Sequence, residues 1–270
     1  MPTPDVIAIR ASSLADLFDC PARWEAKHLR GLRLPSGPGA VLGHAVHAGA
    51  AAFDQAVING EPISFDDAAG IVADAAREEA RTVDVDWSGD MQPADVEKIG
   101  IDLCRLYCEQ VSPEYDWAAV EASCEALVIE DVGLVLTGTT DRIYRDPVLG
   151  YGIADIKTGK SAVAADGTVR TTGHAAQLGV YELLAAASYG VRITAPAHIL
   201  GLQAGKTAKG QRAGSGTVEN ARARLVGDAD SPGLLHHAAA LLHAGRFYGN
   251  PRSQTCHPNY CPAYATCRWR

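Results

Sequence analysis

The stretch that decides the fold is residues 134–157, LVLTGTTDRIYRDPVLGYGIADIK. It holds two apolar runs of β-forming residues, Leu134–Tyr144 and Tyr151–Lys157. Between them lies a turn, Asp146–Gly150, that contains proline and glycine. Two such runs around a turn predict a β-hairpin with a longer loop.

Three charged side chains are expected to meet on this hairpin. Successive side chains of a strand point to opposite faces, so Asp155 and Lys157 emerge together while Ala154 and Ile156 face the other way. Asp141 on the neighbouring strand would add a second carboxylate. Two carboxylates form a hard oxygen site suited to Mg²⁺ or Mn²⁺. A lysine beside them can orient or deprotonate a metal-bound water and balance the charge of a phosphate.

An Asp on one strand followed by Asp-x-Lys on the next resembles the core of the PD-(D/E)xK nucleases. Gly138–Arg142 (GTTDR) and Asp155–Lys160 (DIKTGK) are most similar to the RecB-type branch, although Thr140 stands where the name-giving proline would be. The resemblance implies an α/β, restriction-endonuclease-like core, in which helices flank a central mixed β-sheet. It also implies that Asp141, Asp155 and the backbone carbonyl of Ile156 bind metal.

A predicted helix, Val41 to about Ile58, carries two histidines, His44 and His47, that share one face because they are three residues apart. RecB-type nucleases commonly carry a Gly-x-x-x-His helix whose histidine completes the metal site, and Gly43–His47 matches this spacing. The resemblance therefore implies that His47 is a metal ligand. His44 is interpreted as a packing or surface residue.

A second predicted helix, about Gly173 to Ser188, follows the Asp-x-Lys strand and carries Gln177 and Tyr181 on one face. RecB-type nucleases place a Gln-x-x-x-Tyr helix at this point. The resemblance implies that Gln177 and Tyr181 belong to the catalytic set and steady Lys157 or a phosphate.

Three cysteines, Cys256, Cys261 and Cys267, occur within the last fifteen residues. Such density beside turn-forming residues is typical of a metal-ligand cluster, with three unrelated buried cysteines as the alternative. Three thiolates leave a tetrahedral site incomplete, so Cys20 is the expected fourth ligand and His257 a possible substitute.

One N-terminal and three C-terminal cysteines around a RecB-type nuclease resemble the iron–sulfur nucleases of CRISPR-associated and phage exonuclease type. In those nucleases the cysteines hold a [4Fe–4S] cluster that joins the two chain ends. The first spacing here is Cys-x₄-Cys instead of the Cys-x₂-Cys common in the CRISPR-associated family, so a structural Zn²⁺ site stays open. Either group would contribute to folding.

Composition bounds the class of protein. The 270 residues are 47% hydrophobic and 21% charged, as in soluble globular proteins with a sizeable core. We see neither a signal peptide nor an apolar run long enough for a bilayer, which predicts a cytoplasmic protein whose seven cysteines are reduced or metal-bound. The net charge of −8 argues mildly against DNA binding, unless cations form a local groove. The cations do cluster: Lys27, Arg30 and Arg33; Lys157, Lys160 and Arg170; Lys206, Lys209 and Arg212.

The chain is interpreted as one nuclease domain, 1–270, with a helical N-terminal portion (1–118), a nuclease core (119–230) and a C-terminal helix with the cysteine cluster (231–270). Apolar periodicity and caps predict the remaining elements. These are short helices starting near Ser13 and Pro21, helices over 65–82 and 92–110, strands over 125–130 and Ala197–Gln203, flexible loops over 158–172 and 204–216, and helices over 217–227 and from Ser231 to Ala244.

Together these features predict a Mg²⁺- or Mn²⁺-dependent exonuclease that hydrolyses phosphodiester bonds at DNA ends in recombination or repair, of phage or CRISPR-associated type. Two alternatives remain open: a CRISPR adaptation nuclease, and a non-catalytic end-binding or scaffold subunit with the nuclease fold. Recombination or CRISPR adaptation proteins are the partners implied by the resemblance. An unrelated zinc hydrolase is disfavoured because no His-x-x-x-His spacing occurs.

Overall fold

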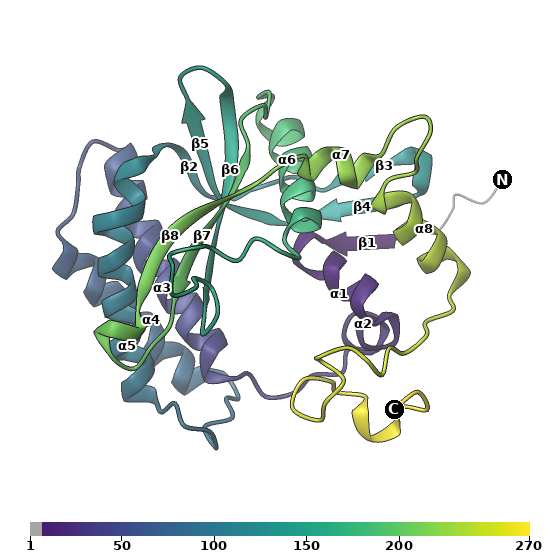
Figure 1. Ribbon diagram of the computed structural model, residues 1–270, viewed down its shortest axis with the longest axis horizontal. Coiled ribbons are helices and arrows are strands. Elements are labelled where there is room, and N and C mark those ends of the chain that lie inside the picture. Colours follow the sequence, from purple (N-terminus) through teal and green to yellow (C-terminus); the bar gives the residue numbers. More distant parts are fainter. Residues whose placement is uncertain (1–6) are drawn as a thin grey trace.

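A five-stranded mixed sheet with helices on both faces forms the centre of the computed structural model, which describes residues 7–270 (Figure 1). All neighbouring strands are antiparallel except β6 and β7, which are parallel. The fold is therefore the predicted α/β, restriction-endonuclease-like architecture. In spatial order the strands are β2 (Asp116–Ser123), β5 (Thr139–Asp146), β6 (Gly150–Gly159), β7 (Ala197–Gln203) and β8 (Arg212–Val218).

The helices bury opposite faces of this sheet. Ile156 and Leu200 belong to the apolar cluster of α3, α4 and α5, whereas Ile153 and Ile199 belong to the cluster of α6, α7 and α8. Strands β6 and β7 are thus covered on both sides, as is usual for parallel pairs. The helices are α1 (Leu14–Asp19), α2 (Pro21–His28), α3 (Pro38–Ile58), α4 (Phe65–Thr82), α5 (Pro93–Leu106), α6 (Ala175–Tyr189), α7 (Ala221–Val226) and α8 (Leu234–Ala244).

The predicted hairpin is present, with its turn made by the Asp146 carboxylate, which accepts hydrogen bonds from the N–H groups of Val148 and Leu149, both at 2.8 Å. The prediction of a single strand from Leu134 to Tyr144 was wrong. The chain breaks at Gly138, where an added Cβ would lie 3.0 Å from Tyr181 Cε1. The close approach of the tyrosine ring favours glycine at this position.

The break divides the run between two sheets. Strand β4 (Leu134–Thr137) joins a small second sheet with the order β1–β4–β3, between β1 (Ile7–Arg10) and β3 (Leu127–Ile129), whereas β5 continues into the central sheet. The predicted strand over 125–130 is shorter, as β3. Strand β1 was not predicted.

Two further strands were missed. Strand β2 begins at Asp116, so the N-terminal stretch that was expected to be helical also contains β1 and the start of β2. Strand β8 occupies part of the predicted loop over 204–216. Its glycines suggested a flexible loop, but they have a packing role. The loop after β6 crosses this strand so closely that an added Cβ at Gly216 would lie 2.8 Å from Thr171 Cγ2.

Several helix boundaries also differ from the prediction. Because β8 continues to Val218, α7 starts at Ala221 instead of 217. The last helix starts at Leu234, after Gly233, instead of at Ser231. Helix α5 ends at Leu106 and continues as a π-helical turn, Tyr107–Val111.

The C-terminal segment lies against α1 and α2 (Figure 1, yellow beside purple). Ala22 N–H donates to the Tyr248 carbonyl at 2.9 Å, and the Asn250 side chain donates to the Asp19 carbonyl at 2.9 Å. Ser253 Oγ donates to the Asp19 carboxylate at 2.6 Å.

Within the part of the chain that the structure describes, no helix has the length and apolar character needed to cross a bilayer.

Candidate active site

The two strands of the hairpin bring the predicted acids and lysine together. The antiparallel register pairs Arg142 with Ala154, which places Asp141 opposite Asp155. Lys157 Nζ lies 2.5 Å from Asp155 Oδ2, and the N–H of Ile156 donates to Asp141 Oδ2 at 2.9 Å. Strand alternation therefore acts here as the sequence pattern predicted.

Helix α3 adds His47 to this group. His47 Nδ1 lies 3.5 Å from Asp141 Oδ2, and Nε2 lies 3.1 Å from the carbonyl oxygen of Ile156. One turn earlier on the helix, an added Cβ at Gly43 would lie 3.2 Å from Thr158 Oγ1. The glycine of the Gly-x-x-x-His pattern thus lets α3 lie close to β6.

His44 lies outside this group. Its side chain is 71% exposed, and Nδ1 lies 2.8 Å from Glu79 Oε1 on α4. This placement agrees with its interpretation as a surface residue.

A third carboxylate, Glu121, was missed in the sequence. The register of β2 on β5, Val120 with Arg142 and Ala122 with Thr140, places Glu121 opposite Asp141. One ligating atom from each of His47, Glu121 and Asp141 lies within 4.8 Å of the others. Recognising β2 as a strand would have revealed an acid inside an apolar run beside the Asp141 strand.

The backbone of Glu121 is unusual, with φ of +44° at a residue that is not glycine. Such conformations are uncommon for residues with a Cβ, cost of order 1–3 kcal/mol and are concentrated at functional sites. The surrounding strands hold the side chain where it reaches His47 Nδ1, 3.9 Å from Oε1.

The negative charges raise proton affinities in this site. Burial raises the pKa of Asp155 to about 6, and the charge of Asp141 adds to the effect against the opposing influence of Lys157 and His47. Burial lowers the pKa of His47, but hydrogen bonding to Glu121 and the charges of Asp141 and Asp155 outweigh it, so the net shift is upward. Both side chains therefore bind a proton more tightly than they would in water.

Asp155 lies beside this group. It is 1% exposed, and its Oδ2 lies 2.5 Å from the ammonium of Lys157. Together with the imidazole of His47 and the carboxylates of Glu121 and Asp141, whose ligating atoms lie within 4.8 Å of one another, it forms a donor set that suits a divalent cation. The residues present therefore fit a metal ion.

Helix α6 supports Asp155 from the other side of the strand pair. Gln177 Nε2 donates to Asp155 Oδ1 at 3.1 Å and lies 2.9 Å from the Tyr181 hydroxyl oxygen. Burial raises the pKa of Tyr181, which remains a neutral phenol. The sequence had suggested that Gln177 steadies Lys157 or a phosphate. In this structure its hydrogen bond is instead to the carboxylate of Asp155.

A family model of the PD-(D/E)XK nuclease superfamily matches residues 9–268. The chain belongs to this superfamily. Its members are nucleases that use divalent metals, which agrees with the acid–histidine–lysine group on β2, β5, β6 and α3. No curated protein matches the chain significantly.

In this PD-(D/E)XK nuclease, a buried polar network lies behind the acids. Arg142 and Asp54 are both 0% exposed, and Arg142 Nε donates to Asp54 Oδ2 at 2.6 Å. The hydroxyls of Tyr107 and Ser112 also donate to Asp54, each at 2.5 Å. Arg142 Nη1 donates to the carbonyl of Asp141 at 2.7 Å. The network therefore joins α3 and the π-helical turn to the strand that carries Asp141.

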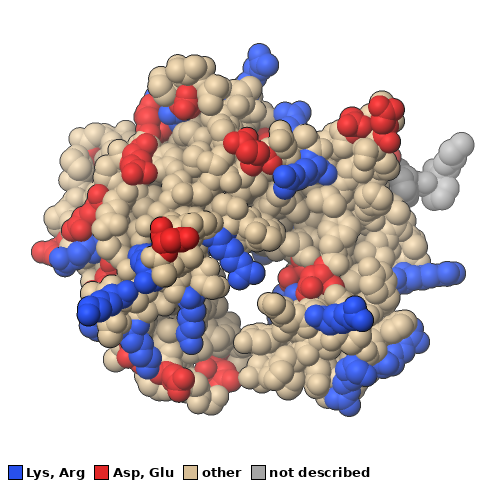
Figure 2. Space-filling model, viewed as in Figure 1, with Lys and Arg blue, Asp and Glu red and all other residues tan. Residues whose placement is uncertain are grey.

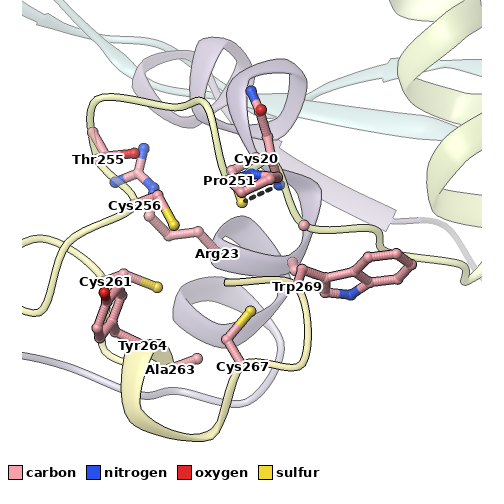
Figure 3. Close-up of a pocket in the computed structure, with 13 residues that line it drawn as sticks. Cys20, Arg23, Pro251, Thr255, Cys256, Cys261, Ala263, Tyr264, Cys267 and Trp269 are labelled. Carbon is pink, nitrogen blue, oxygen red and sulfur yellow. Dashed lines mark hydrogen bonds between the residues drawn. The ribbon is translucent and has the colours of Figure 1, made fainter.

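The same nuclease brings its four predicted cluster cysteines to one cavity. Cys20 at the start of α2 and Cys256, Cys261 and Cys267 of the C-terminal segment all line it (Figure 3). Cys20 Sγ accepts a hydrogen bond from the N–H of Asn250 at 3.4 Å.

The other candidates lie elsewhere. His257 is exposed and is not among the residues that line the cavity. Its Nδ1 accepts a hydrogen bond from the N–H of Asn259 at 3.2 Å. Cys104 and Cys108 are buried on the helical side, with their sulfurs 3.9 Å apart, as expected for small apolar residues. Cys124 is half-buried near Thr140.

Proposed function

We propose that this protein is a Mg²⁺- or Mn²⁺-dependent exonuclease that hydrolyses DNA from its ends, of the RecB type. The observation that carries the proposal is the clustering of His47, Glu121 and Asp141 within 4.8 Å, beside the ion pair of buried Asp155 with half-buried Lys157. Mixed imidazole and carboxylate oxygen donors suit Mg²⁺ and Mn²⁺, and a binding module has no need of a buried carboxylate pair such as Asp141 and Asp155.

We assign the metal ligands as His47, Glu121, Asp141, Asp155 and the carbonyl of Ile156. A bound Mg²⁺ or Mn²⁺ would supply a polarised water and would stabilise the negative charge of the phosphodiester transition state. His47 Nε2 lies 3.1 Å from the Ile156 carbonyl in the present arrangement, so ion binding would replace this contact.

The protein's own groups would do the remaining work. Lys157 Nζ, 30% exposed at the edge of the site, would orient the attacking water and offset the charge of the scissile phosphate. Gln177 would hold Asp155 in its orientation through the 3.1 Å hydrogen bond, and Tyr181 would fix Gln177 in turn.

One face of the protein has a hollow and nearby cations that suit DNA binding. Figure 2 shows a hollow near the middle of one face, bordered by Lys and Arg side chains and a few acidic ones. In the same view of Figure 1 it lies between the part with α4 and α5 and the part with α2 and the C-terminal segment. Local cations of this kind can bind phosphates on a molecule whose net charge is −8.

The test uses purified full-length protein with end-labelled linear DNA and covalently closed circular DNA, with and without Mg²⁺ or Mn²⁺. We expect degradation of the linear DNA alone, and only with metal. Lys157→Ala should lose at least a hundredfold in rate while it retains Mn²⁺ binding. His44→Ala, an exposed residue on the same helix face as His47, should retain the wild-type rate.

Three results would contradict the proposal. Binding of DNA ends without cleavage would indicate the scaffold subunit. Cleavage of the circle would indicate an endonuclease. Lys157→Ala cleaving at the wild-type rate would overturn its assignment.

The same proposal has three further parts: a role in recombination, repair or CRISPR adaptation, a cytoplasmic location, and a single domain over 1–270.

We also propose that Cys20, Cys256, Cys261 and Cys267 hold a [4Fe–4S] cluster. The four cysteines line one cavity, and their order in the sequence, one near the N-terminus and three near the C-terminus, resembles that of the iron–sulfur nucleases. The cluster would be structural and would join α2 to the C-terminal segment.

Metal analysis tests this assignment. Protein purified without air should be brown and should contain about four iron atoms per chain, following cluster stoichiometry. A colourless preparation with one zinc per chain would favour the Zn²⁺ site instead.

A further inference from the structure

One arginine lies in the wall of the cysteine cavity. Arg23, on α2, is 7% exposed and lines the cavity together with all four cysteines. It shares a helix face with Cys20, three residues before it. Figure 3 shows its side chain running along the cavity toward Cys256 and Thr255. Arginine is rarely buried unless its charge has a partner, so the position calls for an explanation.

Part of the guanidinium has such partners. Arg23 Nη2 donates to Asp16 Oδ1 at 2.7 Å and lies 3.7 Å from Asp19 Oδ2. The Asp16 carboxylate also accepts from Lys27 Nζ at 2.9 Å. These contacts are made by Nη2 and face α1.

The Nε–H of Arg23, which lies on the same edge of the guanidinium as Nη2, has no such partner in residues 7–270. Arg23 Nε is buried, and in the described part of the chain it has no hydrogen-bond acceptor. A buried N–H without an acceptor is destabilising, and an acceptor supplied by a bound group would remove the penalty. The unpartnered Nε thus indicates that the cavity holds something that accepts hydrogen bonds.

The charge of the cavity leads to the same conclusion. Among the thirteen residues that line it, Arg23 is the one with a charged side chain, and none is a carboxylate. Four thiolates bound to an iron–sulfur core carry a net negative charge, which is costly to bury without a nearby cation.

We propose that Arg23 donates its Nε–H to a sulfur of the cluster held by Cys20, Cys256 and the two remaining cysteines, and offsets the cluster's negative charge. This inference rests on the proposed [4Fe–4S] cofactor. A hydrogen bond and a positive charge stabilise the more negative, reduced cluster, so Arg23 raises the reduction potential. It also slows loss of iron, because a neutralised cluster is more stable in the buried site.

The experiment compares full-length variants purified without air. Iron content, visible absorption, the electron paramagnetic resonance spectrum after chemical reduction, and a redox titration are recorded for each. Arg23→Met removes charge and donor at similar length. Arg23→Lys keeps the charge and removes Nε. Asp16→Asn breaks the ion pair but leaves Arg23, and Arg30→Gln removes an exposed charge at the end of the same helix.

We expect Arg23→Met to lower the equilibrium constant for one-electron reduction at least tenfold, which corresponds to about 59 mV. It should also lose iron several times faster in air. Arg23→Lys should show a smaller shift in the same direction. Arg30→Gln should titrate within twofold of the wild type, whereas Asp16→Asn should raise the potential or leave it unchanged, because it removes a negative charge beside Arg23.

Several outcomes would overturn the inference. A wild-type potential and iron retention in Arg23→Met would exclude a contact with the cluster. An equal lowering of the potential in Asp16→Asn would show that Arg23 acts through its ion pair alone. If Arg23→Met does not fold, Arg23→Lys at the wild-type potential would exclude the Nε hydrogen bond. Zinc in place of iron in the wild type would refute the cluster and this inference, whereas loss of cleavage with iron present would refute the nuclease proposal only.

Discussion

Asp54 and Arg142 form an ion pair between two fully buried side chains, and each lies close in sequence to a proposed metal ligand. Asp54 follows His47 by seven residues, two turns along α3, and Arg142 directly follows Asp141 on β5. The 2.6 Å contact therefore fixes the position of the helix relative to the strand, and with it the separation of the imidazole and the carboxylate.

Replacing Asp54 by Asn should therefore weaken both the fold and the metal site. Removing one partner of a buried pair leaves the other charge uncompensated, which costs about 3–5 kcal/mol. Among residues 7–270, the remaining ion pair of Arg142 would be the longer 3.6 Å contact of Nη1 with Glu121 Oε1, which compensates only in part. Denaturant unfolding would measure the stability loss, and calorimetry would show weaker Mn²⁺ binding.

The matched control is Glu97→Gln, which breaks the exposed pair between Arg77 and Glu97, 2.5 Å apart. Exposed pairs contribute little, so this variant should unfold and bind Mn²⁺ like the wild type. Equal losses in the two variants would mean that burial of the Asp54–Arg142 pair has no special role.

Glu121→Gln tests the ligand that the sequence interpretation missed. The neutral amide keeps the shape of the side chain but removes one of three clustered negative charges, so Mn²⁺ affinity should fall at least tenfold and cleavage with it. The stability of the metal-free protein should change little, because the decreased repulsion with Asp141 is offset by the loss of the 3.6 Å ion pair with Arg142 Nη1. Wild-type Mn²⁺ affinity by calorimetry would remove Glu121 from the site.

Local patterns and family motifs were enough to predict that Asp141, Asp155, Lys157 and His47 come together. The alternation that joins Asp155 to Lys157 is a property of any strand, and the turn at Asp146 depends on residues next to it. The helix that carries His47 is likewise predicted from its own residues. These parts of the site follow from short-range geometry and family motifs together.

The parts that were missed depend on contacts distant in sequence. Gly138 breaks the predicted strand because the ring of Tyr181, forty-three residues later, lies against it. Glu121 faces the site only because β2 pairs with β5. Asp54 in an apolar helix gave no sign that its partner would be Arg142. Pairing of remote segments, which single-sequence periodicity does not contain, decided each of these positions.

Glu182 on α6 gives the metal-free protein a pH-dependent stability. Burial raises the pKa of Glu182 to about 7, against a hydrogen bond from the Arg222 backbone and the charge of Arg222, which lower it. The native state therefore binds this proton more tightly than the unfolded chain does. Stability from this group is present below pH 4.5 and is lost as pH rises through about 7.

Glu182→Gln should remove this dependence. Its free energy of unfolding should exceed that of the wild type at pH 8 by of order 1–3 kcal/mol, and the difference should shrink toward pH 5. Thermal unfolding in the presence of a chelator at both pH values measures it. Parallel pH profiles for the two proteins would show that Glu182 ionises without cost.

The two histidines of α3 provide a direct test of metal binding, because they lie on one helix face and differ in surroundings. His47 faces Asp141 and the Ile156 carbonyl, whereas His44 is exposed beside Glu79. A ligand that binds only the native state stabilises it by about 2.7 kcal/mol at a hundred times its dissociation constant. Mn²⁺ should therefore raise the melting temperature of the wild type and of His44→Ala equally, and should leave His47→Ala almost unchanged. An equal rise in His47→Ala would place the ion elsewhere, because the imidazole would then contribute nothing to its binding.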